Sequence, residues 1–180
     1  MRWGRNNSRD QFDRHVTPHL DSAYNLARWM VGNPADAEDA VQEACVRAFR
    51  SLPSRRGRES RAWVLTIVRN VCCDRLRQAR RCDPPLPLED ARLPNSMAQD
   101  PLSQLLQSES RERLAQWIEE LPAEFREALV LREMENLSYQ EIAGIVGAPI
   151  GTVMSRLARA RQRLKQRLSM EEEEANRELW

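Results

Sequence analysis

The stretch LSYQEIAGIVGAPIGTVMSRLARARQRLKQRL, residues 137–168, predicts two helices joined by a tight turn. Ser138 is followed three residues later by Glu141, and this spacing is a capping box that marks the start of a helix. Gly147 can adopt the left-handed backbone conformation that ends such a helix. Pro149 suits the first turn of a second helix, where its missing N–H costs nothing. The stretch is therefore predicted to form a helix-turn-helix.

The second helix of this motif separates an apolar face from a basic face. Its apolar residues recur every three or four positions from Val153 to Leu168 and predict one buried stripe. Val153 is expected to point into the angle between the helices, where the small Ala143 lets them cross closely. Between Ile150 and Leu168 there are six basic residues and no acidic one. A solvated basic face normally interleaves Glu with Arg, and this one does not. The unbroken positive charge next to the turn indicates binding to DNA.

Three segments of the chain carry a resemblance to a known family. Residues 121–161 read LPAEFREALVLREMENLSYQEIAGIVGAPIGTVMSRLARAR, residues 35–52 read ADAEDAVQEACVRAFRSL, and residues 61–77 read RAWVLTIVRNVCCDRLR. The first segment is similar to the carboxy-terminal domain of the extracytoplasmic-function (ECF) sigma factors of bacterial RNA polymerase. The other two resemble the amino-terminal domain of that family. The segments stand in the family's order and come from both halves of the chain.

The expected architecture is all-α, with two small helical domains joined by a flexible linker and the helix-turn-helix in the second domain. Five of the ten prolines fall between Cys82 and Pro101, where acidic residues outnumber basic ones, so this part is predicted to be an extended linker. The predicted units are a sigma-2-like domain over 8–82, the linker over 83–101, a sigma-4-like domain over 102–169 and a frayed acidic tail over 170–180. Helices are expected over 8–31 with a break near Thr17 and Pro18, and over 34–50, 63–81, 102–120 and 123–135.

An acidic face is predicted on the helix that begins near Pro34. Acidic residues near a helix amino terminus favour the helix dipole, but Glu43 lies too far along the helix for that account. In ECF sigma factors the matching stretch docks on the clamp helices of the polymerase β′ subunit. The resemblance therefore assigns Asp39, Gln42 and Glu43 to polymerase binding.

The helix expected over 63–81 has a basic outer surface. By resemblance, this helix and the preceding loop capture the melted non-template strand of the −10 promoter element, a task that needs positive charge and a pocket for an unstacked base. The amide of Asn70 and the carboxylate of Asp74 are the expected base contacts, with Arg69 and Arg77 beside them. A purely solvated role remains an alternative for Asp74. Trp63 is expected in the core, and so is Phe49, whose spacing continues the apolar stripe of the helix over 34–50.

The amino-terminal end of the second helix of the helix-turn-helix is expected to enter the major groove of the −35 promoter element. The residues nearest the bases would be Thr152, Ser155, Arg156 and Arg159, and Arg163 would contact phosphate further along. Arg156 is the best candidate for a bidentate contact with a guanine edge. The family often has a basic residue where this chain has Met154.

The distribution of charge indicates more than one macromolecular partner. The chain has 28 Lys and Arg against 27 Asp and Glu, for a net charge of +1. Nine arginines lie between Arg55 and Arg81, whereas four acidic residues and no basic one lie between Asn33 and Ala44. Separate positive and negative surfaces suit different partners.

Several kinds of site and location are not indicated by the sequence. The four cysteines form no C-x-x-C pair and the two histidines lie far from them, so no metal site is expected and the thiols should be reduced, as in the cytoplasm. No apolar run approaches membrane-spanning length, and the first ten residues lack the apolar core of a signal peptide. Since there is no nucleophile–base pair and no phosphate-binding glycine loop, neither catalysis nor a cofactor is expected.

The sequence is thus interpreted as an ECF-type sigma factor that binds core RNA polymerase and directs it to promoters. The family implies contacts with the β′ clamp helices and the β flap, with promoter DNA, and with an anti-sigma factor, and it implies no membrane insertion. One alternative is a dimeric helix-turn-helix regulator of duplex DNA, although such a protein needs neither the acidic face nor the basic helix. Another is a sigma mimic that sequesters an anti-sigma factor. Such a mimic could lose its DNA-facing arginines, whereas this chain retains Arg156, Arg159 and Arg163.

Overall fold

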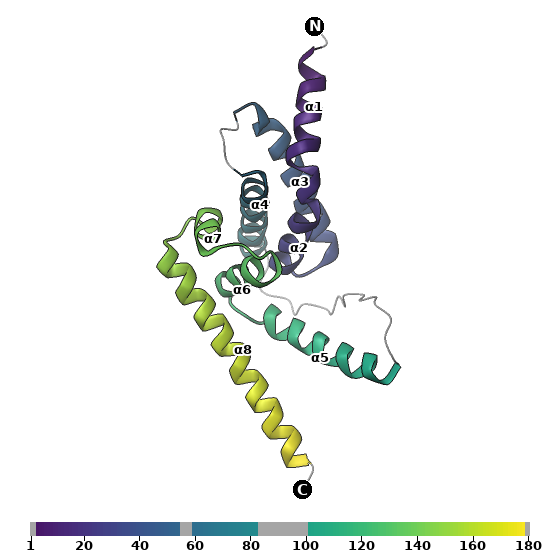
Figure 1. Ribbon diagram of the computed structural model, residues 1–180, viewed down its shortest axis with the longest axis vertical. Helices are drawn as coiled ribbons and strands as arrows, with labels where there is room; N and C mark the ends of the chain where they lie inside the picture. The colour runs from purple at the N-terminus through teal and green to yellow at the C-terminus, as the bar shows by residue number, and fades with distance from the viewer. Residues whose placement is uncertain (1–2, 55–58, 83–100, 179–180) are drawn as a thin grey trace.

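The structure, a computed structural model, describes residues 3–54, 59–82 and 101–178, and within these ranges every regular element is a helix (Figure 1). The expected all-α class is confirmed. The α-helices are α1 Trp3–His15, α2 Leu20–Val31, α3 Pro34–Ser51, α4 Ser60–Cys82, α5 Pro101–Glu119, α6 Ala123–Leu129, α7 Tyr139–Val146 and α8 Ile150–Glu178. Two short 3₁₀ helices are Thr17–His19 (η1) and Leu52–Ser54 (η2), and Val130–Met134 (η3) is a π-helix where the sequence predicted α-helix.

Helices α2, α3 and α4 pack against one another and build the amino-terminal half, α1–α4. The break predicted near Thr17 is present as η1. Asn33 caps α3, because its side chain accepts a hydrogen bond of 2.8 Å from the backbone N–H of Asp36. One side of α3 is a stripe of small buried residues that lets neighbouring helices approach closely, namely Ala37, Ala40, Ala44 and Ala48. Helix α4 buries Val64, Leu65, Val68, Val71 and Cys72 against it.

Two aromatic residues lie further out than the sequence predicted. Trp63 is partly buried and packs on the edge of the core, while the buried position beside it belongs to Leu65. Phe49 is 44% exposed, and its ring contacts Phe12 of α1 with the centroids 6.0 Å apart. Phe49, near the carboxy-terminal end of α3, thus packs against α1 and stays partly open to solvent.

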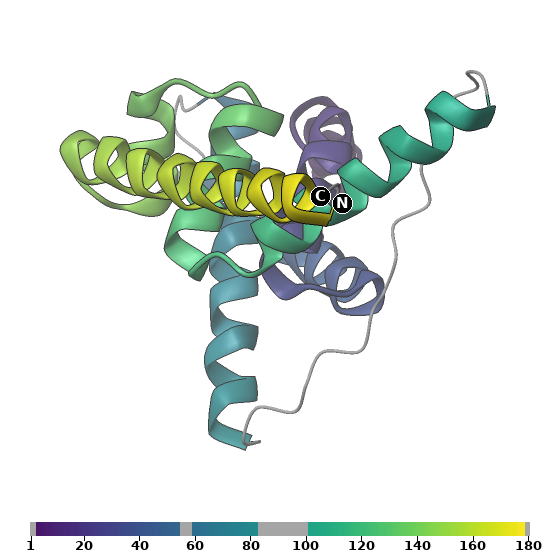
Figure 2. The same cartoon turned by 90° about the horizontal axis from the view of Figure 1, so that it is seen from below.

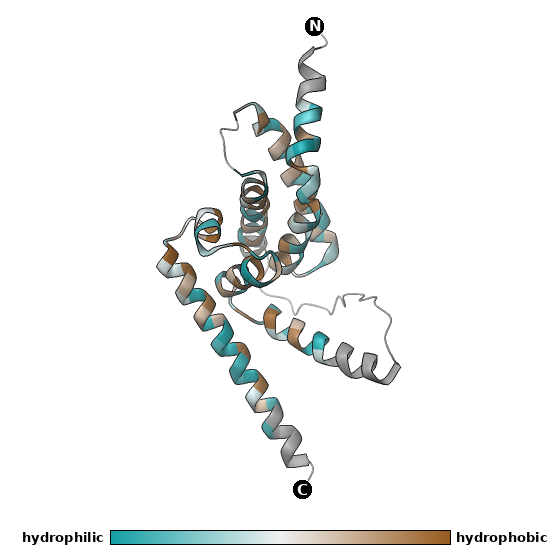
Figure 3. Cartoon of the chain, in the orientation of Figure 1, coloured by the Kyte–Doolittle hydropathy of each residue, from teal (hydrophilic) through white to brown (hydrophobic). Residues whose placement is uncertain are grey.

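Helices α6 and α7 both pack on the first half of α8, and together with α5 they make the carboxy-terminal half, α5–α8. Hydrophilic residues dominate the middle of α8, as Figure 3 shows. The prediction of a frayed tail after residue 169 is wrong, because α8 continues to Glu178. An ion pair of 2.8 Å between Arg113 of α5 and Glu171 holds the beginning of that tail. The buried stripe of α8 ends earlier than expected, since Leu168 is exposed.

The two halves are in direct contact. Helix α4 packs against α7, and α2 packs against α6 and η3. Their buried apolar residues form one continuous cluster. Seen from below, the carboxy-terminal end of α4 projects away from α8 (Figure 2). Residues 83–100, where the linker was predicted, lie outside the described part of the chain. Among the described helices, none is both long and apolar enough to cross a lipid bilayer.

Candidate nucleic-acid interface

The helix-turn-helix has the local geometry that its sequence predicted. The backbone N–H of Ser138 donates to Glu141 Oε2 at 2.7 Å, and the N–H of Glu141 donates to Ser138 Oγ at 3.3 Å, which completes the capping box. The Ser138 side chain, followed by its backbone N–H, holds the pKa of Glu141 below its usual value. Gly147 has φ 67° and donates its N–H to the carbonyl of Ala143 at 3.0 Å. Val153 is fully buried in the angle between α7 and α8.

Pro149 stands one position earlier than predicted, just before α8 begins at Ile150. Its carbonyl accepts the N–H of Thr152 at 2.9 Å, so it still supports the first turn of the helix. The first three turns of α8 present the candidate −35 contacts to solvent. Ser155 and Arg159 are exposed, and Thr152 and Arg156 are partly exposed.

The basic residues of α8 divide into two groups by their ion pairs. Arg161 is bound to Glu133 of η3 at 2.5 Å, and Arg167 is bound to Glu120 at 2.5 Å. Within the described residues, Arg156 and Arg159 form no ion pair. Two of the arginines that the sequence predicted to contact bases are therefore not neutralised by the protein's own described acids, although Arg163 and Lys165 further along α8 also form no ion pair there.

Arg163 has a structural contact that the sequence did not suggest. Its guanidinium carbon lies 5.3 Å from the centre of the Phe125 ring on α6. Cations at this distance from an aromatic face are attracted to it. Arg163 is otherwise exposed, so the same side chain can help to hold α8 on α6 and still offer charge to a phosphate.

The candidate polymerase-binding residues lie on one exposed face of α3. Asp39 is 64% exposed at its side chain, and Gln42 is also exposed. Glu43 is less exposed because it meets arginines on both sides. Arg47, one turn along α3, contacts it at 2.6 Å, and Arg75 of α4 contacts it at 3.4 Å. Arg75 also lies 3.8 Å from Asp39.

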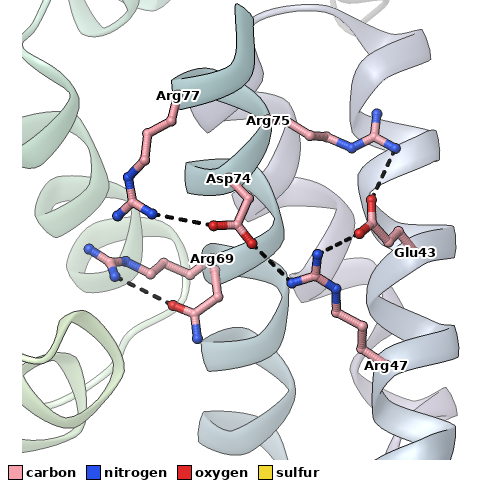
Figure 4. Close-up of polar contacts among 7 residues, drawn as sticks. Glu43, Arg47, Arg69, Asp74, Arg75 and Arg77 are labelled. Atoms are coloured by element: carbon pink, nitrogen blue, oxygen red, sulfur yellow. Dashed lines mark hydrogen bonds and ion pairs between the residues drawn. The ribbon is translucent and has the colours of Figure 1, made fainter.

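Arg47 joins this acidic face to the candidate −10 surface on α4. Besides Glu43, it contacts Asp74 at 3.1 Å, and Asp74 in turn contacts Arg77 at 3.3 Å (Figure 4). Hydrogen bonds to Asp74 and then to Glu43 raise the pKa of Arg47. The structure thus brings two predicted sites, one for polymerase and one for DNA, into a single network. Sequence reasoning missed Arg47, although its spacing of four from Glu43 was a signal for an ion pair on a helix.

The remaining −10 candidates, Asn70 and Arg69, differ in solvent exposure and in their contacts. Asn70 is exposed on α4, and Arg69 donates to its side-chain oxygen at 3.5 Å. The strongest contact of Arg69 is with the other half of the chain, where its Nε donates to Glu127 Oε1 at 2.6 Å. Arg69 is consequently only 22% exposed at its side chain. The −35 candidates lie on a different helix from all of these.

Burial makes the thiols of Cys45, Cys72 and Cys73 poor nucleophiles. Burial raises the pKa of the Cys72 thiol to about 12 and also raises those of Cys45 and Cys73. A thiol with a raised pKa is a poor nucleophile and a poor metal ligand. Among the residues that the structure describes, no three His, Cys, Asp or Glu side chains gather in a way that could hold a metal ion.

Comparison with known proteins agrees with this geometry. The Sigma-70 region 2 family matches residues 15–82, and the family called Sigma-70, region 4 matches residues 111–164. The chain is 33% identical to the RNA polymerase sigma-H factor of Pseudomonas aeruginosa over 87% of this chain and 86% of that protein. It is 36% identical to the ECF RNA polymerase sigma-E factor of Escherichia coli K12 over 71% of both chains.

Another relative is longer than this chain. The ECF RNA polymerase sigma factor SigE of Mycolicibacterium smegmatis is 37% identical over 88% of this chain, which spans 62% of the length of SigE. Among solved structures, the sigma factor RpoE of Bartonella quintana, crystallised with the anti-sigma factor NepR, is similar with a TM-score of 0.73 and 27% identity, covering 88% of this chain and 96% of RpoE. CnrH, solved with the cytosolic domain of CnrY, shares the fold with a TM-score of 0.63 and 24% identity over 88% of each chain.

Proposed function

Because the chain belongs to the sigma-70 family, and within it to the ECF sigma factors, we propose that it binds core RNA polymerase and directs promoter recognition and transcription initiation. The observation that carries the proposal is the exposed start of α8, where Arg156 and Arg159 form no ion pair with any described residue, whereas Arg161 and Arg167 are tied to the protein's own acids. In this role the protein directs RNA polymerase to promoters and catalyses no reaction itself, and it acts in the cytoplasm with the polymerase.

The proposed polymerase contact is the face formed by Asp39, Gln42 and Glu43, which would meet the β′ clamp helices. Its two carboxylates already lie beside Arg47 and Arg75 at distances of 2.6–3.8 Å. Exposed ion pairs of this kind contribute little free energy, so basic residues of a partner can take the place of Arg47 and Arg75 beside the carboxylates at small cost. The contact with the β flap would come from the carboxy-terminal half.

The proposed DNA contacts lie on two helices. Asn70 and Asp74, with Arg69 and Arg77, would hold the melted −10 strand on α4. Support comes from their common helix, from the exposed positions of Asn70, Asp74 and Arg77, and from the positive charge around them. The first turns of α8 would read the −35 duplex through Thr152, Ser155, Arg156 and Arg159, with Arg163 on phosphate.

We further propose that residues 8–82 and 102–169 are separate domains joined by residues 83–101. Two elements separated by about 25 base pairs are roughly 80 Å apart along B-DNA, which a chain can span only if its two DNA-binding parts can move apart. Cutting the chain within residues 86–93 should leave two fragments that are each helical by circular dichroism. A fragment without helical signal would contradict the division.

An anti-sigma factor is proposed as a further partner. RpoE of Bartonella quintana, whose structure resembles this one over most of its length, was crystallised with such a protein. Both predicted DNA-binding surfaces and the acidic face of α3 are surfaces that such a partner could cover.

Run-off transcription with core polymerase tests the proposal. Core polymerase alone should give no transcript from a cognate promoter, and adding the protein should give a transcript with a defined start. The variant Asp39→Asn with Glu43→Gln should lose transcription and core binding, while Glu38→Gln, a neutralised acid on the exposed side of the same helix, should behave as wild type.

The rival functions give different results in the same assays. A conventional regulator would protect duplex DNA as a dimer without polymerase and would not depend on Asp39 or Glu43. A sigma mimic would bind an anti-sigma factor but give no transcript. Either result would overturn the proposal.

A further inference from the structure

Two glutamates of the carboxy-terminal half are buried although they carry charge. Glu127 on α6 and Glu135, just after η3, are only 4% and 3% exposed. Each is paired with an arginine of α4. Arg69 Nε lies 2.6 Å from Glu127 Oε1, and Arg61 Nη2 lies 2.5 Å from Glu135 Oε2. Within the described residues, neither glutamate forms an ion pair inside its own half. We call these two pairs the latch.

Further polar contacts surround the latch and also join the two halves. Asn25 of α2 donates to Glu135 Oε1 at 3.5 Å, which gives this buried carboxylate a second donor from the opposite half. On the same side, Arg126 of α6 donates to the carbonyl of Met30 at 3.4 Å. The apolar packing of α2 on α6 and of α4 on α7 encloses these groups. The contact between halves therefore combines apolar packing with two ion pairs whose glutamates are buried and whose arginines stay partly exposed.

The physics of buried ion pairs makes such a contact selective and reversible. Removing one partner of a buried pair is strongly destabilising, because it leaves a charge without compensation in a poorly solvated place. Separating the halves is different, because both members then return to water and regain their hydration. The attraction within a buried pair roughly balances that hydration. The latch therefore fixes the register in which the halves meet, but a competing partner can open it.

The latch occupies a residue that DNA binding needs. Arg69 has one guanidinium, and in the closed arrangement it is held by Glu127 and donates to Asn70 as well. A DNA phosphate can take this place only if Glu127 leaves. Glu127 and Glu135 thus present negative charge to α4 as a nucleic-acid strand would.

We propose that Glu127 and Glu135 act as an internal competitor of the −10 strand, so that the free protein is closed and Arg69 of its −10 surface is held by Glu127 of its own carboxy-terminal half. Binding of polymerase and promoter separates the halves and frees Arg69 for DNA. This inference rests on the proposed function and adds a regulation of the same −10 site. It predicts that the free protein binds single-stranded −10 DNA weakly and that loss of the latch strengthens this binding.

The test uses the full chain with Glu127→Gln and Glu135→Gln together, which keeps the shape of both side chains and removes their charge. The matched control is Glu133→Gln, which neutralises a glutamate of η3 that is half-exposed and paired inside its own half with Arg161. The radius of gyration is measured by small-angle X-ray scattering. Affinity for a fluorescent single strand carrying the −10 sequence is measured by anisotropy without polymerase.

The expected result is a larger radius of gyration and tighter binding for the double variant only. If the closed form holds about nine tenths of the wild-type molecules, opening it should tighten binding roughly tenfold. A wild-type radius and affinity in the folded double variant would overturn the proposal.

A charge swap keeps the proposal testable if the double variant fails to fold. Arg61 is not among the proposed DNA contacts, so Arg61→Glu should open the protein from the other side of the latch. Combining it with Glu135→Arg should restore the compact form and the weak binding of wild type. If the two single variants and their combination all match wild type, the latch does not control closure.

Run-off transcription with saturating polymerase separates failure of the latch from failure of the proposed function. No transcript with wild-type protein would mean that the sigma-factor role itself is wrong. A normal transcript from wild type, with scattering and affinity unchanged by Glu127→Gln and Glu135→Gln, would reject the latch alone.

Discussion

Replacing Gly147 by Ala should destabilise the helix-turn-helix through backbone strain alone. Gly147 has φ 67°, in the left-handed region, and a Cβ built on it would meet no atom within 4 Å. No steric clash therefore adds to the cost. The left-handed conformation costs an L-residue about 1–2 kcal/mol. The lower entropy of the unfolded chain with Ala offsets about 0.4–1 kcal/mol. The difference between these two values is an expected net loss of about 0.5–1 kcal/mol in the free energy of unfolding.

Gly144, three residues earlier, provides a matched control with the opposite sign. It lies inside α7 with ordinary helical backbone, and a Cβ there would also meet nothing within 4 Å. Gly144→Ala should therefore stabilise the protein by about 0.5–1 kcal/mol, the difference in helix propensity. Gly147→Asn should lose less than Gly147→Ala, because Asn tolerates the left-handed region better.

Urea denaturation followed by circular dichroism measures both changes as shifts of the midpoint. The two alanine variants should differ from each other by about 1–2 kcal/mol. Equal stability of Gly147→Ala and Gly144→Ala would refute the reasoning, since it would mean that the turn does not need a left-handed residue at position 147.

Three further predictions concern single side chains. Asn70→Ala should weaken binding of the polymerase complex to a pre-melted −10 bubble by about 1–3 kcal/mol and spare a −35 duplex; an equal loss on both probes would make Asn70 a structural residue. Arg156→Ala should cost about 1–3 kcal/mol on the preferred −35 duplex and flatten the preference at one base pair. The control Arg161→Ala should cost less binding free energy, since Arg161 is tied to Glu133. If Arg156→Ala instead weakens binding equally for all single-base variants of the −35 duplex, Arg156 contacts phosphate and not a base. Cys72 should resist alkylation at neutral pH in the folded protein, because burial raises its pKa to about 12; rapid labelling seen by mass spectrometry would contradict this.

Local sequence was sufficient to predict the helix-turn-helix. The capping box at Ser138 and the left-handed turn at Gly147 depend on residues within one helical turn of each other, so nothing distant is needed to specify them. The buried position of Val153 follows from the same short stretch. The resemblance of longer segments then indicated the family.

The ends of the helices and the burial of individual side chains were predicted less well from the sequence. The tail after residue 169 is polar and acidic, which predicted fraying, yet α8 continues to Glu178, and Glu171 contacts Arg113 of α5, which lies 58 residues earlier in the chain. Phe49 was expected in the core because its spacing fits the apolar stripe of α3. Which part of a wide stripe is buried depends on how closely the neighbouring helices approach, and only the packed helices decide that.

The glutamates between residues 127 and 135 mark the limit of the sequence most clearly. By itself, the sequence determined that this stretch is helical and that Glu127, Glu133 and Glu135 are acidic residues in it. Nothing in residue type or spacing distinguishes them. The tertiary structure buries Glu127 and Glu135 against arginines of α4 and leaves Glu133 at the surface with Arg161. The physical reason is that burial of a charge depends on a partner about 60–75 residues away in the chain, as the separations of 58 and 74 between the paired residues show, and such a partner is found only when the two halves pack together.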